Sequence, residues 1–159
     1  MSDDFITARE REPGAARSPL TKFNWCEYLA QALRPRATPF PVYSYCNPDR
    51  DYNGETLIEF NENEYVVRTF LSGDELREHR LVVSCRTPSY EESNRLVREA
   101  MRMIEEILRD VENVSLVWTE EGVEADVRGI VEGESFHGYA EFSIFEKKTY
   151  LGDKNGSSV

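Results

Sequence analysis

Basic residues are scarce in this chain of 159 residues. Its 19 lysines and arginines stand against 30 aspartates and glutamates, which gives a formal net charge of −11. Such a charge opposes approach to phosphate backbones and to anionic lipid. The composition therefore disfavours a protein that binds nucleic acid through a basic face. It is compatible with a salt-loving host, with a surface that keeps the protein soluble, or with an acidic passage through which a polyanion slides.

Cysteines and long apolar runs are also few. Cys26, Cys46 and Cys85 are widely scattered and form no Cys-x-x-Cys pair, which excludes a disulfide framework and a zinc knuckle and predicts reduced thiols. No apolar run approaches the roughly 20 residues that span a bilayer. Residues 1–11 are acidic where a signal peptide would be basic and then apolar. We therefore expect a protein without a membrane segment that is assembled in the cytoplasm of a cell.

The common catalytic motifs are missing. The chain has no GxSxG, GxxxxGK[ST] or GxGxxG pattern, which argues against serine hydrolases, P-loop enzymes and dinucleotide binding. Its two histidines, His79 and His137, lie outside any metal-binding spacing and are interpreted as structural, His79 within a solvated strand entry. Cys85 is interpreted as a buried packing thiol, and Trp25 and Trp118 as core or interface residues.

Paired acids are the remaining candidates for chemistry. Asp49 with Asp51, or Glu120 with Glu121, could bind a hard cation or share acid and base roles. Chance pairs are expected in so acidic a chain, and the calcium-loop-like stretch 47–54 lacks the closing glutamate. We therefore predict no catalytic, cofactor-binding or metal-binding residue and no cofactor. An acid-dependent metal enzyme is a distant alternative.

Hydrophobic periodicity predicts two helices. The first is short, with Thr21 as a possible N-cap, Pro35 beyond its end and an apolar stripe of Phe23, Cys26, Leu29, Ala30 and Leu33. The second begins with a Ser89-x-x-Glu92 capping box and extends over about 22 residues. Its apolar stripe consists of Leu96, Ala100, Ile104, Ile107 and Val111.

The other patterned segments predict strands. Runs rich in β-branched and aromatic residues lie at 39–45, 57–60, 65–71, 81–85, 114–118 and 136–145. A Glu120-Glu121-Gly122 turn followed by 123–130 indicates a hairpin with the 114–118 strand. We expect an α+β fold, with a mainly antiparallel sheet packed by one long helix and a short N-terminal helix.

Domain boundaries follow from composition. Residues 1–20 show no hydrophobic period and are predicted to form a flexible arm, and residues 151–159 a polar tail. A single α+β domain is expected over 21–150, since the length corresponds to about one core.

The order of these elements resembles that of the tail terminator, or minor capsid, family of long-tailed viruses. The resemblance covers about residues 21–150 and depends on arrangement and loose motifs. These are the 25–33 helix, the strand ending Val82-Val83-Ser84-Cys85-Arg86, the helix opening Pro88-Ser89-Tyr90, the 114–118 strand, and the closing strand with Tyr139-Ala140-Glu141-Phe142-Ser143-Ile144. The acidic arm 1–19 and the acidic hairpin 120–134 have no counterpart in that pattern.

The resemblance implies a structural virion protein and not an enzyme. Such a subunit forms a homo-oligomeric, hexameric ring that caps the tail tube and joins it to the head or neck. Its partners would be the tail tube protein and a neck or head-tail connector protein, with DNA passing through the lumen without specific binding, and no membrane. The alternatives are another head-to-tail neck or adaptor protein, and a cytosolic peptide-binding adaptor or chaperone module.

Overall fold

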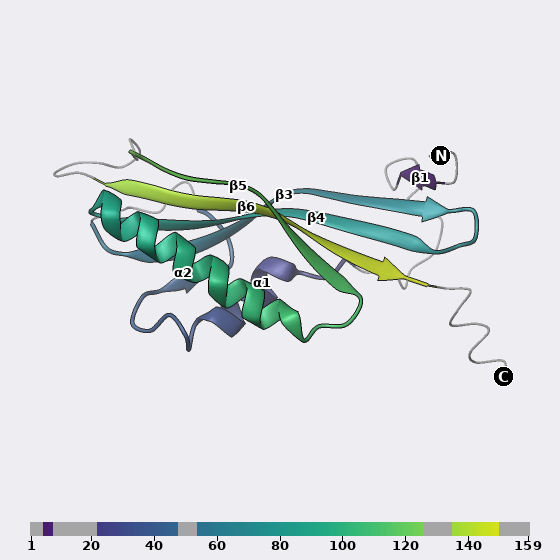
Figure 1. The fold of residues 1–159 in the computed structure, drawn as a ribbon, viewed down its shortest axis with the longest axis horizontal. Coiled ribbons are helices and arrows are strands. Elements are labelled where there is room, and N and C mark those ends of the chain that lie inside the picture. Colours follow the sequence, from purple (N-terminus) through teal and green to yellow (C-terminus); the bar gives the residue numbers. More distant parts are fainter. Residues whose placement is uncertain (1–4, 8–21, 48–53, 126–134, 150–159) are drawn as a thin grey trace.

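The fold is an α+β arrangement in which two helices pack on one sheet (Figure 1). The computed structural model describes residues 5–7, 22–47, 54–125 and 135–149. The elements, in chain order, are β1 (Phe5–Thr7), α1 (Trp25–Leu33), β2 (Val42–Tyr43), β3 (Leu57–Phe70), β4 (Glu75–Thr87), α2 (Tyr90–Arg109), β5 (Val114–Ala125) and β6 (Phe136–Lys148).

The sheet has the strand order β1-β3-β4-β6-β5, with β2 pairing beside β3. The pairings β1–β3, β3–β4, β4–β6 and β5–β6 are antiparallel. The prediction of a mainly antiparallel sheet is nevertheless corrected to a mixed sheet, because β2 runs parallel to β3, with Val42 opposite Ile58.

Side-chain caps fix where both helices begin. In α1 the side chain of Asn24 accepts a hydrogen bond of 3.0 Å from the backbone N–H of Glu27. In α2 the Ser89 hydroxyl accepts one of 3.0 Å from the N–H of Glu92, which confirms the predicted capping position. The helix lengths differ from the prediction, with 9 residues in α1 and 20 in α2. The possible cap Thr21 lies outside the described residues.

The strand β3 is one continuous element where the sequence predicts two. Its 14 residues include the acidic stretch 61–64, and a register shift between Glu62 and Glu64 absorbs one residue without breaking the pairing to β4. A tight turn with Gly73 at a φ of 98° then leads into β4. The β3–β4 hairpin and the end of β6 therefore project well beyond the helices (Figure 1).

The predicted hairpin at 114–130 is wrong. The strand β5 continues through Glu120 and Glu121 as far as Ala125 and pairs with β6. A bulge between Trp118 and Glu120 keeps the register. Gly122 marks a close approach in place of a turn, because a Cβ at this position would lie 3.0 Å from the Tyr139 hydroxyl. The predicted residues 126–130 lie outside the described ones.

The apolar core lies between the helices and one face of the sheet. Leu29, Leu33, Leu96, Ala100 and Ile104 from the helices pack against the strands. The strand residues that they cover are Ile58, Phe60, Leu81, Val83, Cys85, Ala140, Phe142 and Ile144. We call this part of the sheet the apolar half. No helix of the described residues covers the opposite face (Figure 1).

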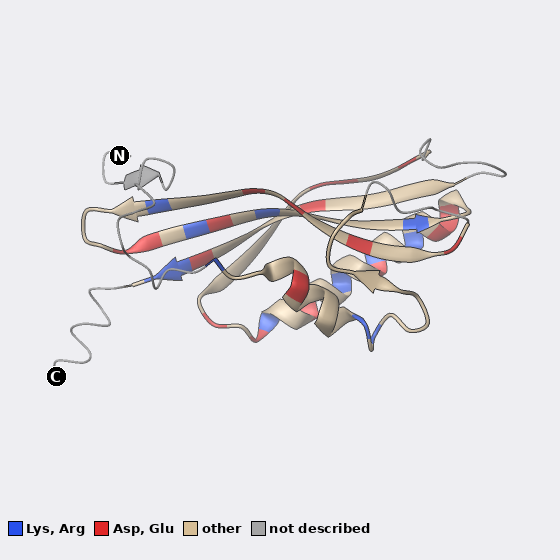
Figure 2. Ribbon diagram, turned by 180° about the vertical axis from the view of Figure 1, so that it is seen from behind, with Lys and Arg blue, Asp and Glu red and all other residues tan. Residues whose placement is uncertain are grey.

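The remainder of the sheet, which we call the polar half, comprises Glu62–Arg80 of β3 and β4 and Phe145–Lys148 of β6. Figure 2 shows that charged positions gather on these strands, whereas the strand segments behind α2 are mostly uncharged. Here the strand β1 pairs with Arg68–Phe70 at the edge of β3. β1 falls within the stretch 1–20 that is predicted as an arm, and the rest of that arm and the tail 151–159 lie outside the described residues.

Candidate functional site

A buried histidine lies where the apolar half meets the polar half. His79 of β4 is fully buried. Its Nδ1 lies 3.0 Å from Oε2 of Glu62 on β3, and its Nε2 lies 2.9 Å from Oε1 of Glu146 on β6. Lys22 Nζ is 2.6 Å from Oε1 of Glu62. We call these four residues the histidine cluster, and the interpretation of His79 as part of a solvated strand entry is wrong.

Aromatic rings enclose the cluster. The ring of Trp25, at the start of α1, meets that of His79 edge-on at a centroid distance of 6.3 Å. The ring of Tyr65 lies 4.6 Å from His79 on the β3 side. The Lys22 ammonium also sits 4.9 Å from the centre of the Tyr65 ring, a cation–π distance. The first turn of α1 is thereby attached to three neighbouring strands.

The geometry of the cluster defines its chemistry. Each imidazole nitrogen faces a carboxylate oxygen, and a carboxylate only accepts hydrogen bonds, so both contacts are satisfied when both ring nitrogens carry protons. The charges then alternate from Lys22 through Glu62 and His79 to Glu146. Both ring nitrogens are engaged by these carboxylates, and the cluster connects β3, β4 and β6.

The carboxylate of Glu146 responds to this environment. Burial by itself would raise its pKa, but the hydrogen bond and charge of His79, the nearby Trp25 indole and Lys148 outweigh burial and lower the pKa from its usual value of 4.5. Burial also raises the pKa of the Cys26 thiol to about 12, and the charge of Glu62 acts in the same direction. Cys26 is therefore a neutral packing thiol.

The other candidate residues from the sequence are spread over the molecule. Cys85 is fully buried in the core and burial raises its pKa, which confirms the packing role. His137 lies on β6 with its ring 5.8 Å from that of Tyr139. Trp118 packs on Phe142 at 5.0 Å and belongs to the core margin. Cys46 is half-buried in the loop after β2.

The structure does not join the paired acids into a site. Glu120 accepts a hydrogen bond of 3.2 Å from the Tyr139 hydroxyl, whereas Glu121 forms an ion pair of 3.3 Å with Arg98 of α2. Asp49 and Asp51 lie outside the described residues. Among the residues that the structure does describe, no three or more histidines, cysteines and acids come together in a way that could hold a metal ion.

A ladder of charges crosses the uncovered face of the polar half. Arg80 contacts Glu78 at 2.8 Å and Glu64 at 2.7 Å, and Ser143 of β6 donates to Glu78 at 3.0 Å. Arg68 of β3 completes the ladder at 3.5 Å from Glu78. The hydrogen bond from Arg80 lowers the pKa of Glu78 although burial opposes this shift. Sequence reasoning missed this ladder, although the alternating charges of residues 75–80 were a signal for it.

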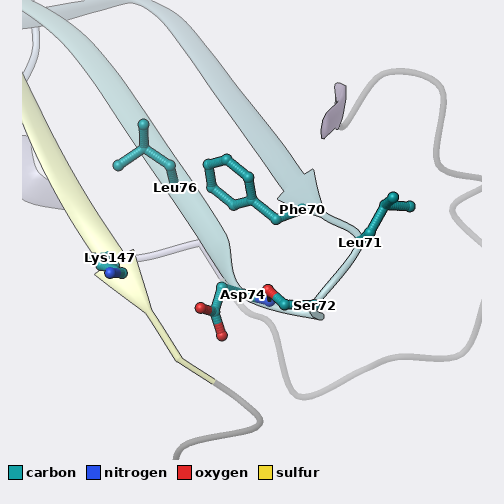
Figure 3. A pocket seen from close by; sticks show the side chains of 6 residues that line it. All are labelled: Phe70, Leu71, Ser72, Asp74, Leu76 and Lys147. Carbon is teal, nitrogen blue, oxygen red and sulfur yellow. Dashed lines mark hydrogen bonds between the residues drawn. The ribbon is translucent and has the colours of Figure 1, made fainter. Parts of the chain in front are cut away.

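The turn between β3 and β4 carries an exposed apolar tip. Leu71 is 79% exposed and points away from its neighbours (Figure 3). A cavity of about 470 Å³ lies beside the turn. It is lined by Phe70, Leu71, Ser72, Asp74, Leu76 and Lys147.

A second hollow, of about 350 Å³, lies between β5 and the end of α2. We call it the edge groove, and it is lined by Glu105, Leu108, Arg109, Val114, Leu116 and Trp118. The Trp118 indole donates a hydrogen bond of 2.8 Å to Glu105, which holds one wall of the groove in place. The groove lies beside β5, the last strand of the sheet, with which only β6 pairs among the residues that the structure describes.

Two comparisons with known proteins found no match. No protein-family model matches the chain, and no curated protein matches it. Within the described residues, none of the helices has the length and apolar character needed to cross a membrane. The features of the described residues that bear on function are the two hollows, the uncovered sheet face and the histidine cluster.

Proposed function

We propose that this chain is a structural assembly protein of the tail terminator type, without catalytic activity. Its copies form a ring that caps a tail tube and joins it to the head or neck of a virion, while DNA passes through the centre. The partners are then further copies of the chain, a tube protein and a neck or connector protein.

The observation that supports this proposal is that both helices cover the same face of the sheet. Both helices pack on the same face (Figure 1), so among the described residues no helix covers the other face, only β6 pairs with β5, and Leu71 at the hairpin tip is 79% exposed. A closed ring needs two different surfaces on each subunit, because each copy contacts one neighbour on either side. The uncovered sheet face and the β3–β4 tip lie on different parts of the molecule and supply two such surfaces, which leaves the β5 edge for another partner.

The charge of the chain agrees with a passage for DNA. A net charge of −11 repels a polyanion and prevents adhesion to the wall of the ring. The exposed side of α2 carries both acidic and basic residues, which can form ion pairs between subunits. There Arg102 bridges Glu99 and Glu106 at 2.7 Å each, and these pairs could exchange with those of a neighbour.

The test is the mass of the purified protein by light scattering, together with negative-stain imaging. A ring of six copies supports the terminator, whereas a ring of twelve favours another neck or adaptor protein. Some ring subunits close only on a tube, so the measurement is repeated after mixing with purified tail tubes. A chain that stays monomeric in both measurements contradicts the proposal.

A peptide-binding adaptor or chaperone is the second candidate, and the edge groove is the observation that favours it. A hollow beside a free strand suits an extended peptide, which gains main-chain hydrogen bonds and side-chain pockets together. A monomer at high concentration that binds extended peptides would favour this candidate over the ring.

A further inference from the structure

The outer side of β5 is a free sheet edge. β5 is last in the strand order, and among the described residues only β6 pairs with it. The backbone N–H of Lys147 donates to the carbonyl of Asn113 at 3.2 Å. In an antiparallel pair every second residue bonds to the partner strand, so the backbone groups of Val114, Leu116 and Trp118 point outward.

The first half of this edge lacks the usual protection against pairing. Residues 114–119 read VSLVWT, which combines high β-propensity with no charge, and Val117 is 48% exposed. Exposed edges are normally protected by charged residues, proline or bulges. In β5 such devices begin only at the end of this stretch, with the bulge between Trp118 and Glu120, and continue with the acids Glu120, Glu121 and Glu124.

The same three residues shape the edge groove. Val114, Leu116 and Trp118 direct their side chains toward α2 and line the groove together with Leu108. A strand added at this edge would pair with their backbone and place every second side chain in the groove. Main-chain pairing and apolar pockets therefore coincide at one place.

We propose that this edge binds an extended segment of a partner protein by strand addition. The segment alternates apolar and polar residues opposite 114–119 and carries basic residues opposite Glu120–Glu124. This inference rests on the proposed assembly function and identifies the surface that meets a partner, such as a tube or neck protein.

Charge decides between a partner segment and a second copy of the chain. A second copy would bring the same three acids and its own net charge of −11 to the contact. A basic segment is attracted both by the acidic half of β5 and by the field of the whole chain. The binding is therefore weakened by salt, as expected for contacts at the rim of an interface.

The first experiment uses a synthetic peptide that alternates valine and threonine and ends in two arginines and a lysine. Hydrogen exchange of the full chain, measured with and without the peptide, should show slower exchange at Leu116 and Trp118 and unchanged exchange in β3. The control peptide is methylated on alternate backbone nitrogens, which removes its donors on one side. Equal protection by both peptides, or none by the first, overturns strand addition.

The second experiment uses the variant Glu124→Lys to test the part of β5 that carries Glu120, Glu121 and Glu124. Glu124 is exposed at the far end of β5. Reversal of its charge should lower the affinity for the peptide about threefold or more, which is the scale of an exposed ion pair. Glu55→Lys makes the same charge change at an exposed residue before β3 and serves as the matched control. Equal weakening by both variants means that only net charge acts, which overturns the assignment to β5.

The two proposals fail in different ways. If rings form while the peptide leaves β5 unprotected, the assembly function stands and this inference is wrong. If the chain stays monomeric with and without tubes and the peptide protects Leu116, the ring is wrong and strand addition stands. Protection of Leu116 by ring formation alone would show that a second copy occupies the edge, which overturns the inference.

Discussion

The two halves of the sheet solve the same packing problem with different side chains. In the apolar half, Phe60, Val83 and Phe142 belong to the core under the two helices and are almost completely buried. In the polar half the same face of the strands continues with His79, Arg77 and Glu75, which are also buried. There each charge has an opposite charge beside it, because a lone buried charge is costly.

The difference shows what each half contributes. The apolar half supplies most of the stability through removal of apolar surface from water. Paired buried charges contribute little net stability over apolar residues of similar size, but their geometry is strict. The polar half thus fixes the direction in which the β3–β4 hairpin projects and the position of its exposed tip at Leu71.

The largest expected effect is in the apolar half. Phe142→Ala removes a fully buried ring that packs on Trp118, and we expect a loss of about 4 kcal/mol in the free energy of unfolding. Urea denaturation measures it. Phe145→Ala, on the uncovered face of the same strand, is the matched control and should cost clearly less. Equal losses would mean that the two faces of β6 are buried alike.

The next effect is in the histidine cluster. His79→Ala removes the histidine partner of the buried Glu146 and one of the two partners of the half-buried Glu62, and should cost about 3 kcal/mol. Replacing Glu62, His79 and Glu146 together by leucine removes the unpaired charges and should recover most of that loss. If the triple variant is as unstable as His79→Ala, the hydrogen bonds themselves carry stability and the contrast between the halves is weaker than stated.

A close contact holds α2 on the apolar half. A Cβ at Gly138 of β6 would lie 2.7 Å from the backbone oxygen of Ser93, so Gly138→Ala must displace the helix and should cost about 2 kcal/mol. Gly122→Ala is the control, since there the nearest atom is the mobile end of Tyr139 at 3.0 Å. Thermal unfolding of both variants distinguishes a backbone contact from a side-chain contact. A smaller shift for Gly138→Ala than for Gly122→Ala would contradict the tight helix–sheet contact.

The smallest effect is the pH dependence that Glu146 confers. Its pKa is lowered in the folded state, so its contribution is present above the usual value of 4.5 and is lost as the pH falls through the folded value. Glu146→Gln should therefore reduce the acid sensitivity of unfolding and cost about 1 kcal/mol at neutral pH, a value reduced for partial solvent screening. Urea titrations over a pH series measure the difference. Parallel curves for the two proteins would show that His79 does not stabilise the carboxylate.

Local patterns were sufficient for the helices and for most strand positions. The Ser89 capping box and the 3.6-residue stripe of α2 depend on neighbours within a few residues, and the structure places the helix start as predicted. The final strand was also found, because its aromatic pattern is local. The breaks predicted at 61–64 and 120–122 were wrong because pairing with β4 and β6 stabilised these acidic stretches.

The surfaces proposed for binding were less accessible to sequence reasoning. Nothing near His79 in the chain indicates that Glu62 and Glu146, 17 and 67 positions away, meet its two nitrogens. The edge groove likewise combines α2 with β5, and its position at the margin of the sheet depends on the complete strand order. The VSLVWT stretch was visible as a strand, but not as an edge.

The amino-acid sequence by itself determined the acidic charge, the two amphipathic helices and the segments that favour extended backbone. These properties follow from composition and from contacts between residues close in the chain. Only the tertiary structure decided that His79 is buried between two carboxylates, that β5 lies at the margin of the sheet, and that one sheet face has no helix among the described residues. Burial and exposure depend on which distant segments pack together, and that choice minimises unpaired polar groups and exposed apolar surface over the whole molecule.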